Sequence, residues 1–116
     1  MDKITNDTQL AQIRGLLRVC DLFLELNGRL PLRCVQAFLA VAQRPGQSVG
    51  DYARQTTLST STMSRNLLDI GERNRYDEKG YGLIQGRDNP NNRREREYYL
   101  TPAGEALLRK VLALVG

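Results

Sequence analysis

The segment from Ser48 to Arg65 constrains the fold more than any other part of the sequence. Ser48 and Asp51 have the spacing of a capping box, which predicts a short helix that begins after Ser48 and runs to about Gln55 or Thr56. A turn of a few residues follows, and Ser59 is a favourable N-cap for a second helix. The sequence therefore predicts two helices joined by a tight turn.

The second helix, expected from about Thr60 to Glu72, combines one narrow apolar face with polar residues elsewhere. Met63, Leu67 and Ile70 recur at helical spacing and predict its buried stripe. Hydroxyl residues are poor helix formers, so their concentration here suggests a contact surface rather than a merely solvated face. Together with the N-cap, the candidate contact residues are Ser59, Thr60, Ser61, Thr62, Ser64, Arg65 and Asn66.

A β-hairpin is predicted next, after a polar loop from about 74 to 82. One strand runs from Leu83 to about Arg87, residues 88–92 are rich in turn formers, and the run from Arg93 to Leu100 alternates as a strand does. Two helices joined by a turn and followed by a hairpin make a winged helix-turn-helix, a mainly α fold with a small antiparallel β-hairpin. The candidate DNA-contact residues of the hairpin are Arg87, Asn91, Asn92, Arg93, Arg94 and Arg96. The alternative for the four arginines is ion pairing with acidic residues of the hairpin.

Helices are also expected at both ends of this unit, over residues 7–27 and 102–115, and another from Leu32 to Gln43. Thr101 caps the last helix, with Pro102 at its first position. Both terminal helices carry apolar residues on more than one face, and burial of one such side chain contributes about 1.5–3 kcal/mol. They either pack on the small core or pair with a second copy, and we favour a homodimer of single-domain chains spanning residues 1–116.

The composition favours a nucleic-acid partner and excludes several chemistries. Arginine supplies 14 of the 17 basic residues, and the net charge is +4, which suits phosphate and base edges. The chain has no histidine, and no nucleophile–base pair is visible, so we expect no enzyme and no cofactor. Cys20 and Cys34 lack zinc-site spacing, so we expect no metal and interpret both as buried and inert, with redox sensing as the alternative.

Two further features concern location. No apolar run is long enough to span a membrane, and the N-terminal residues do not have the pattern of a signal peptide. We therefore expect a cytoplasmic protein that does not associate with membranes.

Several short motifs, taken in order from roughly Leu32 to Arg109, resemble the MarR family of bacterial winged-helix regulators. They are residues 58–65 (LSTSTMSR), 82–84 (GLI), 90–94 (PNNRR) and 100–104 (LTPAG). The resemblance implies a homodimer that binds a pseudo-palindromic operator and represses transcription. It further implies that Ser61, Thr62, Ser64 and Arg65 face the major groove, and that the arginines of segment 92–94 enter the minor groove. Many relatives release DNA on binding a small aromatic ligand, and some respond to cysteine oxidation.

The chain also departs from the family pattern. Thr57 stands in the turn where a glycine is usual, and Asn92 replaces the wing acid, with Asp88 as an alternative charge partner. About eight extra residues, within 73–81, precede the Gly82-Leu83-Ile84 motif. The sequence ends at Gly116, before the further long helix of the family, so we expect a shortened member.

These features together predict a sequence-specific regulator of transcription that binds double-stranded DNA. A replication or partition accessory protein with the same fold is a close alternative. A winged-helix module that binds an acidic protein partner is a second alternative. The sequence identifies neither the operator nor a small-molecule ligand.

Overall fold

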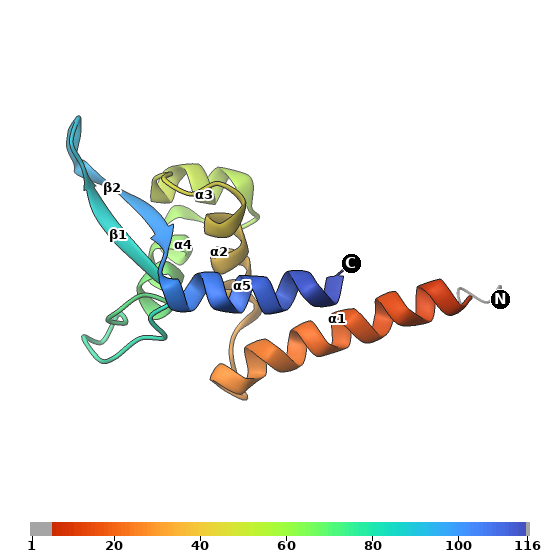
Figure 1. Cartoon of the computed structure of the whole chain (residues 1–116). Helices are drawn as coiled ribbons and strands as arrows, with labels where there is room; N and C mark the ends of the chain where they lie inside the picture. Colours follow the sequence, from red (N-terminus) through yellow and green to blue (C-terminus); the bar gives the residue numbers. More distant parts are fainter. Residues whose placement is uncertain (1–5, 116) are drawn as a thin grey trace. The chain divides into compact units, whose positions relative to one another are not determined.

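The computed structural model describes residues 6–115, with the backbone only for Arg93 and Arg94. Within this range the chain forms five helices and one two-stranded hairpin, and the hairpin lies between the fourth and fifth helices in the sequence (Figure 1). The described residues form two compact units, one made of residues 6–30 and 106–115 and the other of Pro31–Glu105. The predicted mainly α fold with a small antiparallel hairpin is confirmed.

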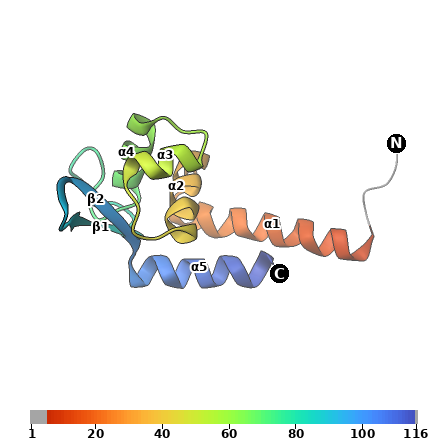
Figure 2. The same ribbon diagram turned by 90° about the horizontal axis from the view of Figure 1, so that it is seen from above.

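The unit Pro31–Glu105 is the winged helix-turn-helix. Its elements are α2 (Leu32–Gln43), α3 (Val49–Gln55), α4 (Thr60–Asp69), β1 (Ile84–Asn89) and β2 (Asn92–Leu100). Helix α2 packs against α3, α4 and β2, and α3 packs against α4 and β2 (Figure 2). The predicted apolar stripe of α4 is buried together with side chains of α2, α3 and β1. The core of this unit includes Ala37, Phe38, Val41, Tyr52, Met63, Leu67, Ile70 and Ile84.

Tyr52 is fully buried at the centre of this unit and links the α2–α3 turn to β2. Its hydroxyl donates to the carbonyl oxygen of Arg44 at 2.7 Å and accepts the N–H of Gln47 at 3.2 Å. Beside it, the N–H of Gly46 donates to the Tyr98 carbonyl at 2.8 Å, and the N–H of Tyr98 donates to the Gln47 carbonyl at 3.2 Å. The turn therefore lies along β2 as a short third segment and fixes the base of the hairpin.

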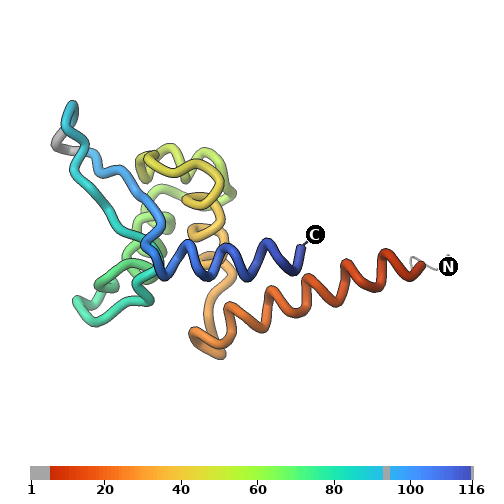
Figure 3. The backbone as a smooth tube through the Cα atoms, in the orientation of Figure 1, coloured from red at the N-terminus to blue at the C-terminus, as the bar shows by residue number. Residues whose placement is uncertain are grey.

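The strands of the hairpin, Ile84–Asn89 and Asn92–Leu100, are longer than the sequence suggests. Figure 3 traces the hairpin backbone as it projects from the helices. The predicted turn over 88–92 is confined to Pro90 and Asn91, because Asp88 and Asn89 remain in the ladder opposite Arg96 and Asn92. The register is irregular between Asp88 and Asn89, as at a bulge. The N–H of Asn91 donates to Asn89 Oδ1 at 2.9 Å, which lets the short turn close.

Helix α4 ends at Asp69, three residues before the predicted Glu72, because the chain that returns from the insertion binds its end. The N–H groups of Tyr81 and Leu83 donate to the carbonyls of Asp69 and Ile70, at 3.3 and 2.8 Å. Gly80 passes so close that a Cβ there would clash with the Gly71 carbonyl. The insertion is thus a folded segment that satisfies carbonyl groups which a helix end leaves unpaired.

The other unit contains α1 (Asp7–Leu26) and the part of α5 (Pro102–Val115) that begins at Ala106. The two helices run side by side in opposite directions (Figure 1, Figure 2). Gly15 permits this contact, because a Cβ there would clash with the Leu114 carbonyl. Asn6 caps α1 through a reciprocal pair of hydrogen bonds with Gln9. No helix in the described range 6–115 is long and apolar enough to cross a membrane.

Candidate nucleic-acid interface

The predicted capping box at the start of α3 is present. Ser48 Oγ accepts the N–H of Asp51 at 3.2 Å, and Asp51 Oδ2 accepts the N–H of Ser48 at 3.1 Å. Arg54 forms an ion pair with the same carboxylate. The hydrogen bonds that this carboxylate accepts from Ser48, first from the backbone N–H and then from the hydroxyl, lower the pKa of Asp51. The capping box therefore fixes the start of α3, the first helix of the helix-turn-helix, directly after Ser48.

The turn between α3 and α4 is closed by a threonine side chain. Thr56 Oγ1 donates to the Tyr52 carbonyl at 3.0 Å and accepts the N–H of Leu58 at 3.3 Å. Among the described non-glycine residues only Asp77 has a positive φ, of 57°. Thr57 therefore takes the place of the glycine usual in this turn without left-handed backbone strain.

The N-terminal turn of α4 presents a cluster of hydroxyl groups. Ser59 Oγ caps the helix by accepting the N–H of Thr62 at 3.2 Å, and it lies 3.0 Å from Thr62 Oγ1 and 3.3 Å from Ser61 Oγ. Ser59, Thr60 and Ser61 are exposed, whereas Thr62 and Ser64 are half-buried. Five of the seven predicted helix residues thus lie at or beside one helix N-terminus.

Arg65 is exposed one turn further along α4. Its side chain makes no hydrogen bond or ion pair with any residue in the described part of the chain. The guanidinium is therefore free to reach a partner beyond the protein surface. Arginine has the donor geometry that reads guanine edges or binds phosphate oxygens.

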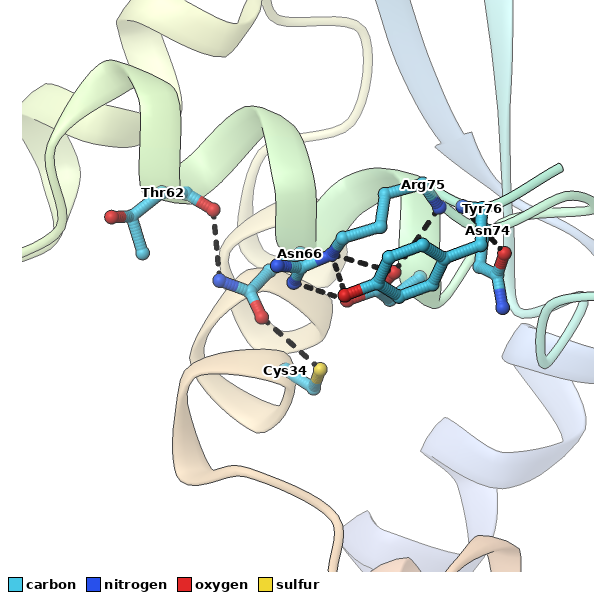
Figure 4. Close-up of polar contacts among 7 residues, drawn as sticks. Cys34, Thr62, Asn66, Asn74, Arg75 and Tyr76 are labelled. Atoms are coloured by element: carbon cyan, nitrogen blue, oxygen red, sulfur yellow. Dashed lines mark hydrogen bonds and ion pairs between the residues drawn. The ribbon is translucent and has the colours of Figure 1, made fainter.

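Asn66 does not lie with the other predicted contact residues. It is only 4% exposed and belongs to the buried stripe, between Met63 and Leu67. Its Oδ1 accepts the Cys34 thiol at 3.2 Å, and its Nδ2 donates to the Thr62 carbonyl at 2.8 Å (Figure 4). We therefore leave Asn66 out of the contact surface, because its polar atoms are used inside the domain.

Two of the predicted hairpin arginines bind the hairpin itself. The Arg96 guanidinium donates to the Gly86 carbonyl at 2.8 Å and lies 4.0 Å from the Asp88 carboxylate. The Arg87 guanidinium lies 4.3 Å from the centre of the Tyr99 ring. Arg96 therefore braces the strands, with Asp88 as its charge partner, and Arg87 stacks on the neighbouring strand.

The tip of the hairpin carries the remaining predicted residues. Asn91 and Asn92 are exposed there. The side chains of Arg93 and Arg94 lie outside the described part of the structure, so the prediction that they contact DNA stays a prediction.

The two cysteines differ, although the sequence suggested that both are buried. Cys34 is 2% exposed, and burial, followed by the charge of Asp69, raises its pKa to about 11. Cys20 is exposed, so the expectation of burial is wrong for this residue. The described residues contain no group of three His, Cys, Asp or Glu side chains that would hold a metal ion.

Comparison with known proteins identifies the fold. No protein-family model matches the sequence, and no curated protein matches it. Solved structures do match, with TM-scores near 0.6. A crystal structure of a MarR family transcription regulator superposes with a TM-score of 0.62 and 24% identity over 91% of this chain. This chain spans 58% of the length of that relative.

Two further matches are structures with nucleic acid. A point mutant of MepR from S. aureus, bound to an oligodeoxyribonucleotide, matches with a TM-score of 0.66 and 16% identity over 92% of this chain and 72% of its own. FabT from Streptococcus pneumoniae, in complex with DNA, matches with a TM-score of 0.61 and 15% identity over 89% of this chain and 68% of its own. The chain therefore has the winged-helix fold found in MarR-family transcription regulators.

Proposed function

We propose that this protein is a sequence-specific regulator of transcription that binds double-stranded DNA with α4 in the major groove. One observation carries the proposal: Arg65 is exposed and unpaired within the described residues, next to the exposed hydroxyls of Ser59, Thr60 and Ser61 on one capped helix. Short polar groups and one long arginine at the start of a helix suit contact with base edges and phosphates. The fold shared with MepR and FabT, which were both solved with DNA bound, supports DNA binding.

The hairpin tip is the second part of the proposed interface. Arg93 and Arg94 contact the minor groove or the backbone, beside exposed Asn91 and Asn92. Arg87 and Arg96 contribute less, because each already binds within the hairpin. The interface therefore consists of α4 and the hairpin tip.

We further propose that the protein acts as a homodimer through α1 and α5. Within their unit, large apolar side chains remain exposed on both helices: Leu10, Ile13, Leu16, Leu17, Leu24, Leu112 and Val115. Leu16 and Leu17 are 60% and 62% exposed, so a second copy has substantial apolar area to cover. Pairing also doubles the DNA contacts of a small module.

Selection of bound sequences from a random duplex pool tests the DNA-binding proposal. We expect one preferred, two-fold-related sequence, with an affinity that falls steeply with salt. About six to eight phosphate contacts per dimer predict a log–log slope of about −5 to −7. Recovery of an unselected pool would contradict sequence-specific binding, and retention of an acidic protein at salt that abolishes duplex binding would favour the protein-interaction alternative.

Sedimentation at micromolar concentration tests the dimer. The wild-type protein should sediment as a dimer, and Leu17→Glu should shift it toward the monomer because a charge at a covered apolar position is costly. Arg14→Glu, on the same helix and also exposed, is the matched control. A wild-type monomer would remove our account of the apolar residues of α1 and α5.

A further inference from the structure

Asn66 is a buried amide within an otherwise apolar stripe. It lies three residues after Met63 and one before Leu67, which are 0% and 2% exposed. A buried amide destabilises a fold unless both of its polar groups are hydrogen-bonded. An apolar residue at this position would avoid the free-energy cost of burying a polar group. The presence of an amide here therefore needs a physical explanation.

Asn66 joins α2 and α4 through two hydrogen bonds whose donors and acceptors can be assigned. The Cys34 thiol, from the first turn of α2, donates to Asn66 Oδ1 at 3.2 Å, and Asn66 Nδ2 donates to the Thr62 carbonyl at 2.8 Å (Figure 4). A carbonyl only accepts, so the Thr62 contact allows one orientation of the amide. Burial raises the pKa of Cys34 to about 11, which keeps the thiol protonated as a donor at neutral pH.

The hydrogen bond between Cys34 and Asn66 restrains rotation of α4 about its own axis, which apolar packing alone restrains only weakly. Apolar side chains such as Met63 and Leu67 tolerate small rotations of α4 about its axis, because their contacts have little directionality. The thiol–amide bond weakens when its angle changes. The same rotation would swing the exposed side chains of Ser61 and Arg65, which lie on the opposite side of α4 from the core.

We propose that Cys34 and Asn66 are positioning residues that fix the rotation of α4 on α2 and thereby sharpen base discrimination by Ser61 and Arg65. The proposal rests on the DNA-binding function proposed above. A single buried polar contact is a well-attested way to specify one helix register among several that hydrophobic packing permits. Here it would select one rotation of the contact helix.

The double variant Cys34→Val/Asn66→Leu tests the proposal. It removes donor and acceptor together, so no buried group is left unpaired and the fold should persist. We expect the ratio of affinities for selected and random duplex to fall roughly tenfold or more, which is the discrimination of about one base contact. The salt slope should not change, because no phosphate contact is lost. Cys34→Ser, which keeps a donor, should retain most of the wild-type ratio.

Two outcomes overturn the proposal. One is an unchanged affinity ratio in a folded double variant when the wild-type protein discriminates. The other is an unchanged rate of amide hydrogen exchange along α4, which we expect to rise in the variant and which is measured without DNA. If the double variant does not fold, Cys34→Ala and Cys34→Ser are compared by the same two measurements, because only the serine keeps a donor for Asn66 Oδ1. A wild-type protein that selects no duplex contradicts the proposed function instead, and the exchange rates then still decide whether the contact restrains α4.

Discussion

Helix α4 and the β1–β2 hairpin both present arginines, yet these arginines differ in what they already bind. Arg65 on α4 makes no hydrogen bond or ion pair with the described residues, whereas Arg96 donates to the Gly86 carbonyl at 2.8 Å. Arg87 stacks on Tyr99 at 4.3 Å. All three side chains are exposed, so exposure alone does not distinguish a residue available to a partner from one that holds its own element together.

The difference has a simple physical origin. On a helix, side chains meet mainly at a spacing of three or four residues. Asp69 lies four residues after Arg65, but its carboxylate is bound by Arg75 instead. In a hairpin each side chain has a direct neighbour across the ladder, 4.5–5.5 Å away in typical pairs. Hairpin arginines such as Arg87 and Arg96 therefore find local partners more readily than an arginine on a helix does.

The largest expected effect comes from Arg65→Ala. Loss of the free guanidinium should weaken binding to the selected duplex by about 1–3 kcal/mol and relax the preference at one base position. Arg33→Ala, which removes one exposed charge from α2, is the matched control and should weaken selected and random duplex alike. Titration of both duplexes with each variant provides the measurement. If both variants weakened binding to the selected and the random duplex by the same factors, Arg65 would be no more specific a contact than any other exposed arginine.

A smaller effect is expected from Arg96→Ala and Arg87→Ala. Each should lower the free energy of unfolding by about 0.5–1 kcal/mol, since exposed pairs and exposed cation–π contacts contribute little. Neither should change which duplex is selected, because both guanidinium groups bind within the hairpin. Denaturant unfolding and pool selection measure the two quantities. A changed base preference without a loss of stability would assign these arginines to the interface.

The smallest effect concerns pH and is confined to the hairpin. The Tyr99 hydroxyl donates to Glu97 Oε2 at 2.9 Å, and this bond raises the pKa of Tyr99. A group whose pKa is raised by folding stabilises the fold below its usual pKa, and the contribution is lost as pH rises through the folded value. Wild type and Tyr99→Phe should therefore differ in stability at neutral pH and converge in strong alkali. A difference that persists there would show that the bond to Glu97 is not its source.

The local signals in the sequence predicted the helix-turn-helix well. Ser48 with Asp51, Ser59 and Thr101 each cap the helix expected of them. Such caps depend only on residues within three or four positions, so the sequence contains the whole interaction. The same locality explains why the bounds of α2 are as predicted, from Leu32 to Gln43.

Other features depend on partners far along the chain and were missed. The polar side chain of Asn66 predicts a surface position, although its spacing of three from Met63 places it on the buried stripe. Its partner Cys34 is 32 residues away. No local pattern marks Tyr52 as the residue that joins α3, the α2–α3 turn and β2, because its bonds to Arg44, Gln47 and Tyr98 depend on how the turn folds. The sequence predicts too late an end for α4, because the segment that returns from the insertion ends this helix.

That insertion has a consequence for any attempt to graft or shorten this domain. Its return leg supplies the N–H groups of Gly80, Tyr81, Gly82 and Leu83 to carbonyls at and just beyond the end of α4. Arg75 from the same segment holds the Asp69 carboxylate at 2.5 Å. Deleting the extra residues to match a shorter homologue would remove the N–H groups that bind the carbonyls at the end of α4. A chimera must therefore exchange the loop and the last turn of α4 together.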